Sequence, residues 1–275
     1  MLSFKSGSRQ KKSTFDIVTS SAAILVALFV FAALGFLVIR GVPYFGETLK
    51  SDEVRFAIGL SLKTALLSTA VCLVLGVPAA YALSRPSSRS GNLLAAIIEL
   101  PLSVPNIMLG LSLLLMFSSV PGKFLSAHGV KVIFNVSGIV LAHILVNMPF
   151  VIRMVKTAFM NVDRRYEIVA GSLGAGSFRT FLLVTLPLAK NAVIGAGVLA
   201  WSRALGEFGA TLMLVGATRM KTETIPTSIY LNMATGDMGP AMACAMILLI
   251  ISGISLFITN RLNKAPGEQN EHLRR

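Results

Sequence analysis

Two oppositely charged side chains interrupt an apolar stretch in the second half of the sequence. Arg203 and Glu207 lie four residues apart within residues 188–215, and this spacing places both on one face of a helix. Ionisable groups inside a membrane span are costly and are usually paired or functional. We therefore expect either a structural ion pair, formed with each other or with neighbouring helices, or a functional contact, such as one between Arg203 and a passing anion.

Residues that could do catalytic or metal chemistry are scarce. The chain has no G-x-x-x-x-G-K-[ST] phosphate loop, no H-E-x-x-H and no G-x-S-x-G, so we expect neither an ATP site of that type nor an enzyme. His143 stands alone in an apolar segment, where hydrogen-bonded structure is the commoner role. Cys72 and Cys244 make no metal pattern, and we expect them to be buried in apolar packing. The sequence predicts no catalytic residue, no metal site and no cofactor bound by this chain.

The apolar residues gather in six long segments. These are residues 17–39, 64–84, 100–122, 132–152, 188–215 and 238–260. A helix needs ~20 such residues to cross a bilayer, and a chain in hydrocarbon must satisfy its backbone groups internally. The sequence therefore predicts an all-α integral membrane protein with six transmembrane helices over residues 17–261, between tails 1–16 and 262–275. The first segment exceeds the 7–15 apolar residues of a signal peptide, so we interpret it as an uncleaved helix.

The net charge of +13 would suit a nucleic-acid partner, but the placement of the charges favours another explanation. Most of the 25 Lys and Arg lie before the first segment, after the last one, or between the second and third and the fourth and fifth. Cytoplasmic loops attract Lys and Arg. We therefore predict a multi-pass protein of the cell (inner) membrane with both termini in the cytoplasm, no nucleic-acid partner, and an anionic ligand as a secondary reason for the charge.

The longest hydrophilic segment, residues 153–187, is predicted to be cytoplasmic and structured. Asp163 can cap a short helix, Gly174 can end it, and Ser177 can cap a second helix before Pro187 begins the fifth span. A two-helix loop in a protein with little other soluble mass is a candidate docking surface. The alternative is a plain connector that lies on the membrane.

Helix breakers and small residues mark several spans. Ala196, Ala200 and Ala204 recur every four residues, and such stripes let helix backbones approach closely. Prolines can bend the helices that contain them. They lie inside the second, third and fourth spans, at Pro78, Pro101, Pro105 and Pro149.

The cytoplasmic loop resembles the signature loop of ABC-importer permeases, written E-A-A, three residues, G, nine residues, I-x-L-P. Gly174 is followed after nine residues by V-T-L-P, which ends in Leu186 and Pro187. The E-A-A positions fall on residues 168–170, so Ala170 matches, while the glutamate stands one residue earlier, at Glu167. The resemblance implies that this loop couples the membrane domain to a separate ATPase through Glu167, Ala170, Gly174, Leu186 and Pro187.

Three further segments resemble the molybdate-type permeases, which group with tungstate and sulfate permeases. They are RALGEFGATLMLVG at 203–216, ETIPTSIYLNMATGDM at 223–238 and ELPLSVP at 99–105. The resemblance implies the permease subunit of an ATP-driven importer that moves a tetrahedral oxyanion inward by alternating access. Molybdate is the first expectation, tungstate the second and sulfate the third.

The same resemblance implies the partners. They are a second copy of the chain, two cytoplasmic ATPase subunits that use the ATP, and an extracytoplasmic oxyanion-binding protein. The path would follow the interface between the two permease copies, with Ala200, Arg203, Ala204 and Glu207 at its gate.

Two other classes of function remain open at this point. An ion-coupled secondary transporter would use Arg203 and Glu207 as an ion relay, but the inverted repeats typical of that class are not evident. A purely structural membrane protein would leave the register from Gly174 to Pro187 unexplained.

Overall fold

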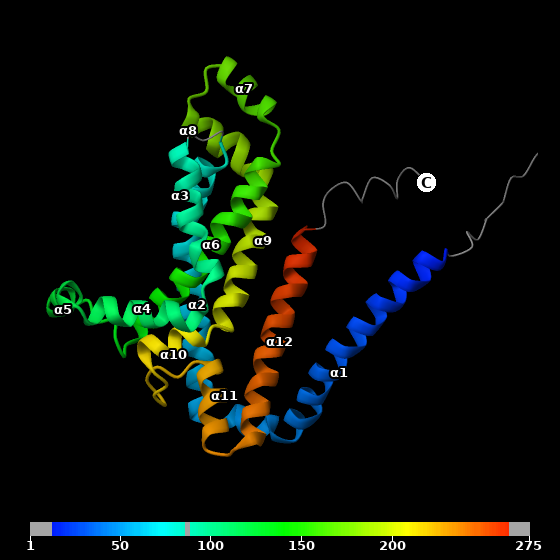
Figure 1. The fold of residues 1–275 in the computed structure, drawn as a ribbon, viewed down its shortest axis with the longest axis vertical. Coiled ribbons are helices and arrows are strands. Elements are labelled where there is room, and N and C mark those ends of the chain that lie inside the picture. Colours follow the sequence, from blue (N-terminus) through cyan, green and yellow to red (C-terminus); the bar gives the residue numbers. More distant parts are fainter. Residues whose placement is uncertain (1–12, 86–88, 264–275) are drawn as a thin grey trace, which may run out of the picture.

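The computed structural model describes residues 13–85 and 89–263, and every regular element in these two ranges is helical (Figure 1). The predicted all-α class is therefore confirmed. Of the two predicted tails, residues 1–12 and 264–275 lie outside the described part of the chain.

Five helices are long and apolar enough to cross a membrane. They are α1 (Thr14–Lys50), α2 (Asp52–Leu83), α6 (Val136–Met160), the continuous helix Ser177–Leu205, and α12 (Met238–Asn263). Pro78 lies inside α2 and Pro149 inside α6 without ending either helix. These five agree with five of the six predicted spans.

The remaining span is broken, and the prediction of one helix over residues 100–122 is wrong. The chain forms α3 (Arg89–Glu99) and a 3-10 turn, η1 (Leu100–Ser103), and then turns by 109° into α4 (Asn106–Ser118). Proline disfavours helical geometry in the residue before it, and Val104, which precedes Pro105, is extended. The chain therefore has six spans only if this bent pair counts as one.

Shorter elements connect the long helices. They are α5 (Val120–Ala127), α7 (Arg164–Ser172), α8 (Ser177–Thr180), the π-helical turn η2 (Phe181–Thr185), α9 (Leu186–Leu205), α10 (Gly209–Val215) and α11 (Ile225–Ala234). The segments α8, η2 and α9 follow one another without a gap and make up the continuous helix 177–205. The predicted fifth span, residues 188–215, therefore has the wrong bounds and is also broken: its helix begins at Ser177 and ends at Leu205, and a turn separates it from α10.

Helices α2, α6 and α9 form the centre of the molecule, with α7 and α8 at one end (Figure 1). Small side chains allow this packing: Cys72 and Ala80 of α2 and Ala196 and Ala200 of α9 are buried in one cluster with Val151 of α6. Close packing of small residues replaces the hydrophobic effect between helices in a bilayer.

Helix α1 packs against α12 near one end and then diverges from it (Figure 1). At the contact a Cβ on Gly41 would lie 2.9 Å from the backbone oxygen of Met242, and Gly239 lies against the ring of Tyr44. None of the most apolar window of α1 is buried inside the chain. This helix therefore presents its apolar surface to lipid or to another protein.

Candidate functional site

The loop between α6 and α9 contains the two helices that the sequence predicts, α7 and α8, although α8 continues without a gap into η2 and α9. The Oδ1 of Asp163 accepts a hydrogen bond of 2.9 Å from the backbone amide of Arg165 at the start of α7. At the other end, the amide of Ala175 donates to the carbonyl of Ala170 at 3.0 Å, and Gly174 has a φ of +87°. This is a Schellman turn with glycine at its left-handed position. In one detail the structure differs: Gly176, not Ser177, is the cap of α8.

Glu167 points from α7 into the protein. Its carboxylate contacts the guanidinium of Arg85, just beyond the end of α2, and accepts a hydrogen bond from the hydroxyl of Thr185 in η2. The Arg85 and Glu167 side chains are only 20% and 15% exposed, and Arg85 stacks 4.5 Å from the ring centroid of Tyr81. We call these contacts the Glu167 clamp. It joins the loop to α2 and to the helix that continues into α9.

The opposite face of the loop is apolar and exposed. Tyr166, Ile168 and Val169 on α7 are more than half exposed, as are Leu173 in the turn and Phe178 on α8. Exposed apolar patches of this kind mark interaction sites.

The other predicted coupling residues lie in the same loop or just after it. Ala170 is half-buried at the end of α7, and Leu186 and Pro187 open α9. All five sequence-predicted residues therefore belong to one end of the molecule. Leu186 packs against the apolar cluster of α2 and α6, while Glu167 makes polar side-chain contacts with Arg85 and Thr185.

A second cluster joins the two broken spans. Glu207 lies in the turn between α9 and α10 and is 5% exposed. Its carboxylate accepts hydrogen bonds from the side-chain nitrogen of Asn106, at 2.7 Å, and from the backbone amide of Ala210, at 2.9 Å. Asn106 is the first residue of α4. A Cβ on Gly110 of α4 would lie 2.5 Å from the carbonyl oxygen of Ala210, so α4 and α10 are in backbone contact.

Arg203 is exposed and points to other partners. Its Nε donates to the Oδ1 of Asn147 at 3.3 Å, and its guanidinium lies 4.8 Å from the ring centroid of Phe150. The described residues contain no ion pair between Arg203 and Glu207. Of the expected alternatives, an ion pair between these two residues is therefore absent, and each side chain binds a neighbouring helix instead, Glu207 through Asn106 and Arg203 through Asn147. Helix α9 ends before Glu207, next to two glycines of low helix propensity, and the carboxylate takes amide donors instead.

Ala200 and Ala204 lie inside the protomer. Ala200 packs in the cluster shared with α2 and α6, and Ala204 packs against Ala65 of α2 and Leu248 of α12. They fix the position of α9 against its neighbours, whereas Arg203 lies on its open face.

The sequence analysis missed two amide side chains, Asn106 and Asn147. Each lies beside or near a proline within an apolar segment, Asn106 directly after Pro105 and Asn147 two residues before Pro149. A polar residue next to a helix breaker in a membrane span could have signalled both, because such residues are expensive in lipid.

The far end of the molecule carries an ionic network and a pocket. Arg219 contacts Glu53 and donates to Asn232 at 3.2 Å, and it lies 3.8 Å from the fully buried carboxylate of Glu223.

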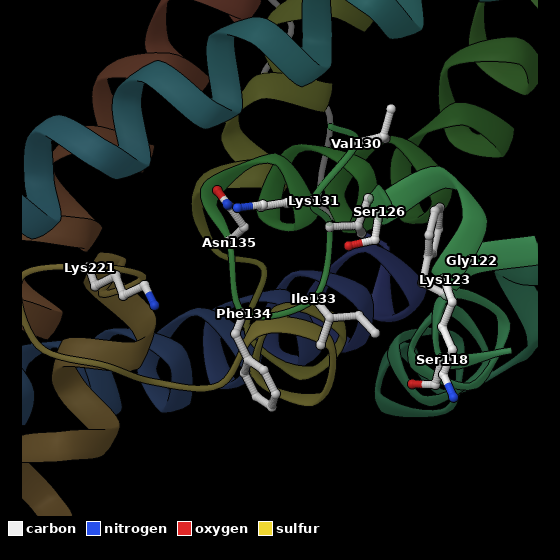
Figure 2. Close-up of a pocket in the computed structure, with 12 residues that line it drawn as sticks. Ser118, Gly122, Lys123, Ser126, Val130, Lys131, Ile133, Phe134, Asn135 and Lys221 are labelled. Carbon is white, nitrogen blue, oxygen red and sulfur yellow. The ribbon is translucent and has the colours of Figure 1, made fainter. Parts of the chain in front are cut away.

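A pocket of about 550 Å³ opens between α5 and the loops before α6 and α11 (Figure 2). Lys123, Lys131 and Lys221 line it without converging on one point (Figure 2). The pocket thus has a basic rim.

Comparisons with known proteins agree with this architecture. Residues 72–266 match the family described as the inner membrane component of binding-protein-dependent transport systems. The chain is 36% identical over 214 residues to the molybdenum transport system permease protein ModB of Mycobacterium tuberculosis, covering 77% of this chain and 81% of that protein. It is 34% identical over 224 residues to ModB of Escherichia coli, covering 80% and 97%. The molybdate/tungstate transport system permease protein WtpB of Pyrococcus furiosus is 33% identical over 212 residues, covering 77% and 79%.

Solved structures share the fold. A chain of a bacterial alginate ABC transporter, in complex with an alginate-bound periplasmic protein, superposes with a TM-score of 0.72 at 17% identity, over 90% of this chain and 93% of that one. A chain of the MetNI methionine ABC transporter in an inward-facing conformation superposes with a TM-score of 0.55 at 17% identity, over 78% and 100%.

Proposed function

Because the chain belongs to the family of inner membrane components of binding-protein-dependent transport systems, we propose that it is the permease subunit of an importer for a tetrahedral oxyanion, with molybdate as the principal substrate. The family makes it a multi-pass transport subunit of an ABC system. The observation that carries the coupling mechanism is the α7–α8 loop, which presents an exposed apolar face at one end of the helices and a buried clamp beneath it.

The loop is suited to transmit movement from a cytoplasmic ATPase. Tyr166, Ile168 and Leu173 provide the apolar contact surface, and Gly174 sets the sharp turn that aims it. The Glu167 clamp then links that surface to α2 and, through η2 and α9, to Arg203. Short π-helical turns such as η2 are frequent at functional sites. ATP is bound by the partner ATPase, and this chain holds no cofactor of its own.

The substrate assignment rests on relatives. The curated relatives named above are molybdenum or molybdate/tungstate permeases at 33–36% identity over most of the chain. Molybdate and tungstate are tetrahedral dianions of nearly equal size, so a path that admits one admits the other, and sulfate is the third candidate. An extracytoplasmic binding protein selects among them and docks at the end that carries the basic pocket of Figure 2.

The working unit contains two copies of this chain and two ATPase subunits. Support comes from α1, whose most apolar window finds no partner within the chain, and from α4 and α5, which project from the side of the molecule (Figure 1). Since α7 docks on the cytoplasmic ATPase, both termini face the cytoplasm. The N-terminal end of α1 and the C-terminal end of α12 point to the side that carries α7 (Figure 1).

We assign the residues of the gate different roles. They are Ala200, Arg203, Ala204 and Glu207. Glu207 fastens the broken third and fifth spans through Asn106, while Ala200 and Ala204 support α9 from behind. The alternative, a secondary transporter with Arg203 and Glu207 as an ion relay, is less well supported, because the family match is to binding-protein-dependent transport systems.

Reconstitution tests the proposal. We expect proteoliposomes that contain this chain, its ATPase and its binding protein to accumulate radiolabelled molybdate only with ATP, and excess tungstate to compete. Uptake driven by an ion gradient without the ATPase would refute the importer mechanism. ATP-dependent uptake of sulfate with no uptake of molybdate would refute the substrate assignment.

A further inference from the structure

A groove runs between α6 and α9 on the open face of the molecule. It encloses about 510 Å³, and its walls come mainly from these two helices. The wall residues that matter here are Phe150, Arg153 and Thr157 of α6, Asn161 directly after it, and Ala192 and Ala196 of α9. Phe150 to Asn161 spans about 17 Å along a helix at 1.5 Å per residue, roughly half the thickness of the hydrocarbon core.

Arg203 continues the groove beyond its enclosed part. It lies seven residues after Ala196, so two helical turns place both on the same face of α9. Its side chain rests on Phe150, whose ring also lines the groove. The Nε of Arg203 is used by Asn147, but its two Nη groups meet no acceptor within residues 13–85 and 89–263. The two Nη groups of the guanidinium are thus available as hydrogen-bond donors to an anion.

Asn147 gives an independent indication of a ligand. Its side chain is 1% exposed, its Oδ1 accepts from Arg203, and its Nδ2 has no hydrogen-bond partner in the described structure. A buried amide nitrogen without a partner is energetically unfavourable. Because this nitrogen is fully buried, an oxygen ligand held by Arg203 supplies the missing acceptor when the Asn147 amide turns toward the groove.

A lipid-facing role does not explain this surface. Arg153, Thr157 and Asn161 line the groove, Arg203 lies beside it on Phe150, and no Asp or Glu is among the lining residues. Charged side chains inside a membrane protein face water-filled paths or protein because their cost in hydrocarbon is high. The groove is therefore an aqueous or protein-covered passage with one sign of charge.

We propose that this groove is the inward path of the oxyanion and that the anion is handed from Arg203 and Asn147 to Arg153. The proposal rests on the function proposed above and assigns residues to its substrate. Guanidinium forks bind tetrahedral oxyanions through paired hydrogen bonds. Arg153 lies three to six residues further along α6 than Phe150 and Asn147, or about 5–9 Å along the axis, a short step for one ion. Because Arg203 and Arg153 are both exposed, each contact is weak enough to release the anion.

Charge-selective cysteine labelling tests the groove without any partner protein. Thr157→Cys places a thiol on its wall, and Cys72 and Cys244 are buried. We expect a negatively charged methanethiosulfonate to react about tenfold faster than a positively charged one of similar size, and sodium molybdate to slow it more than sodium chloride of equal ionic strength. The double variant Arg153→Gln/Arg203→Gln should lose both effects. Arg40→Gln is the matched control, because Arg40 also stacks on an aromatic ring, Phe36, but lies on α1.

Transport measurements separate this proposal from the one on which it rests. In proteoliposomes with the ATPase and binding protein, Arg203→Gln should lower molybdate uptake at least tenfold while binding-protein-stimulated ATP hydrolysis persists, and Arg203→Lys should restore part of the uptake. Unchanged labelling ratios in the double variant, or loss of uptake no greater than in Arg40→Gln, would overturn the groove as the path. Joint loss of assembly and ATPase activity in both Arg203 variants would also overturn it, in favour of a structural role. A wild-type complex that takes up none of the three oxyanions would instead overturn the proposed function.

Discussion

Replacing Glu167 by alanine removes the one side chain of α7 that binds two other helical segments. The carboxylate takes a charge-assisted contact from Arg85 and a hydroxyl donor from Thr185. Hydrogen bonds to charged groups contribute about 1.5–3 kcal/mol each. Both ionic side chains keep 15–20% exposure and water replaces part of what is lost, so we expect a net loss of about 2 kcal/mol. This raises the population of loops detached from α2 and η2 about 30-fold.

Hydrogen exchange measures this population directly. In the detergent-solubilised permease, the backbone amides of α7 should exchange about 30-fold faster in Glu167→Ala than in the wild type, because local opening sets their exchange rate. Thr185→Val should give a smaller increase. Arg85→Ala combined with Glu167→Ala should add little to Glu167→Ala alone, since the two residues share one interaction. In the assembled transporter, Glu167→Ala should hydrolyse more ATP per molybdate moved.

Glu47→Ala is the matched control, because Glu47 is an exposed acid on α1. Its α7 amides should exchange at the wild-type rate. If Glu167→Ala also leaves the exchange of α7 unchanged, the clamp does not hold the loop. If exchange accelerates but the ratio of ATP to molybdate stays constant, the clamp holds the loop without serving coupling.

Three further predictions concern the loop, the broken spans and the topology. Gly174→Val should insert normally but transport poorly, because a β-branched residue resists a φ of +87° by about 1–2 kcal/mol; Gly171→Val, equally open in space but inside α7, is the control, and equal uptake by the two variants would contradict the argument. Asn106→Leu leaves the buried carboxylate of Glu207 with one donor fewer and should destabilise the protein by about 1–3 kcal/mol, visible as a lower melting temperature that Asn106→Leu/Glu207→Gln partly restores; a wild-type melting temperature in Asn106→Leu would refute this. An alkaline phosphatase fused after Arg275 should be inactive, and high activity would place the C-terminus outside.

The helical class, most of the spans and the form of the loop could be predicted from the sequence, for local physical reasons. A long apolar segment in a bilayer must form its backbone hydrogen bonds within itself, and a helix does this. Asp163 and Gly174 act on the helix ends next to them, so the capped helix α7 and its Schellman turn follow from residues within one short stretch. The start of the fifth span could not be predicted in this way: its helix begins at Ser177 and runs through Pro187 without a gap.

The partners of charged side chains depended on contacts between distant segments. Spacing along a helix predicts a pair between Arg203 and Glu207, but Asn106, about a hundred residues earlier in the sequence, takes the carboxylate, and Asn147 and Phe150 take the arginine. In the same way, Glu167 finds Arg85 across the fold. Local sequence patterns, such as caps, turn glycines and apolar segments, determine that a segment is helical and where α7 begins and ends. Which side chains meet is decided by how the broken spans and α2, α6 and α9 pack, because a buried charge takes the nearest donors that the assembled bundle offers.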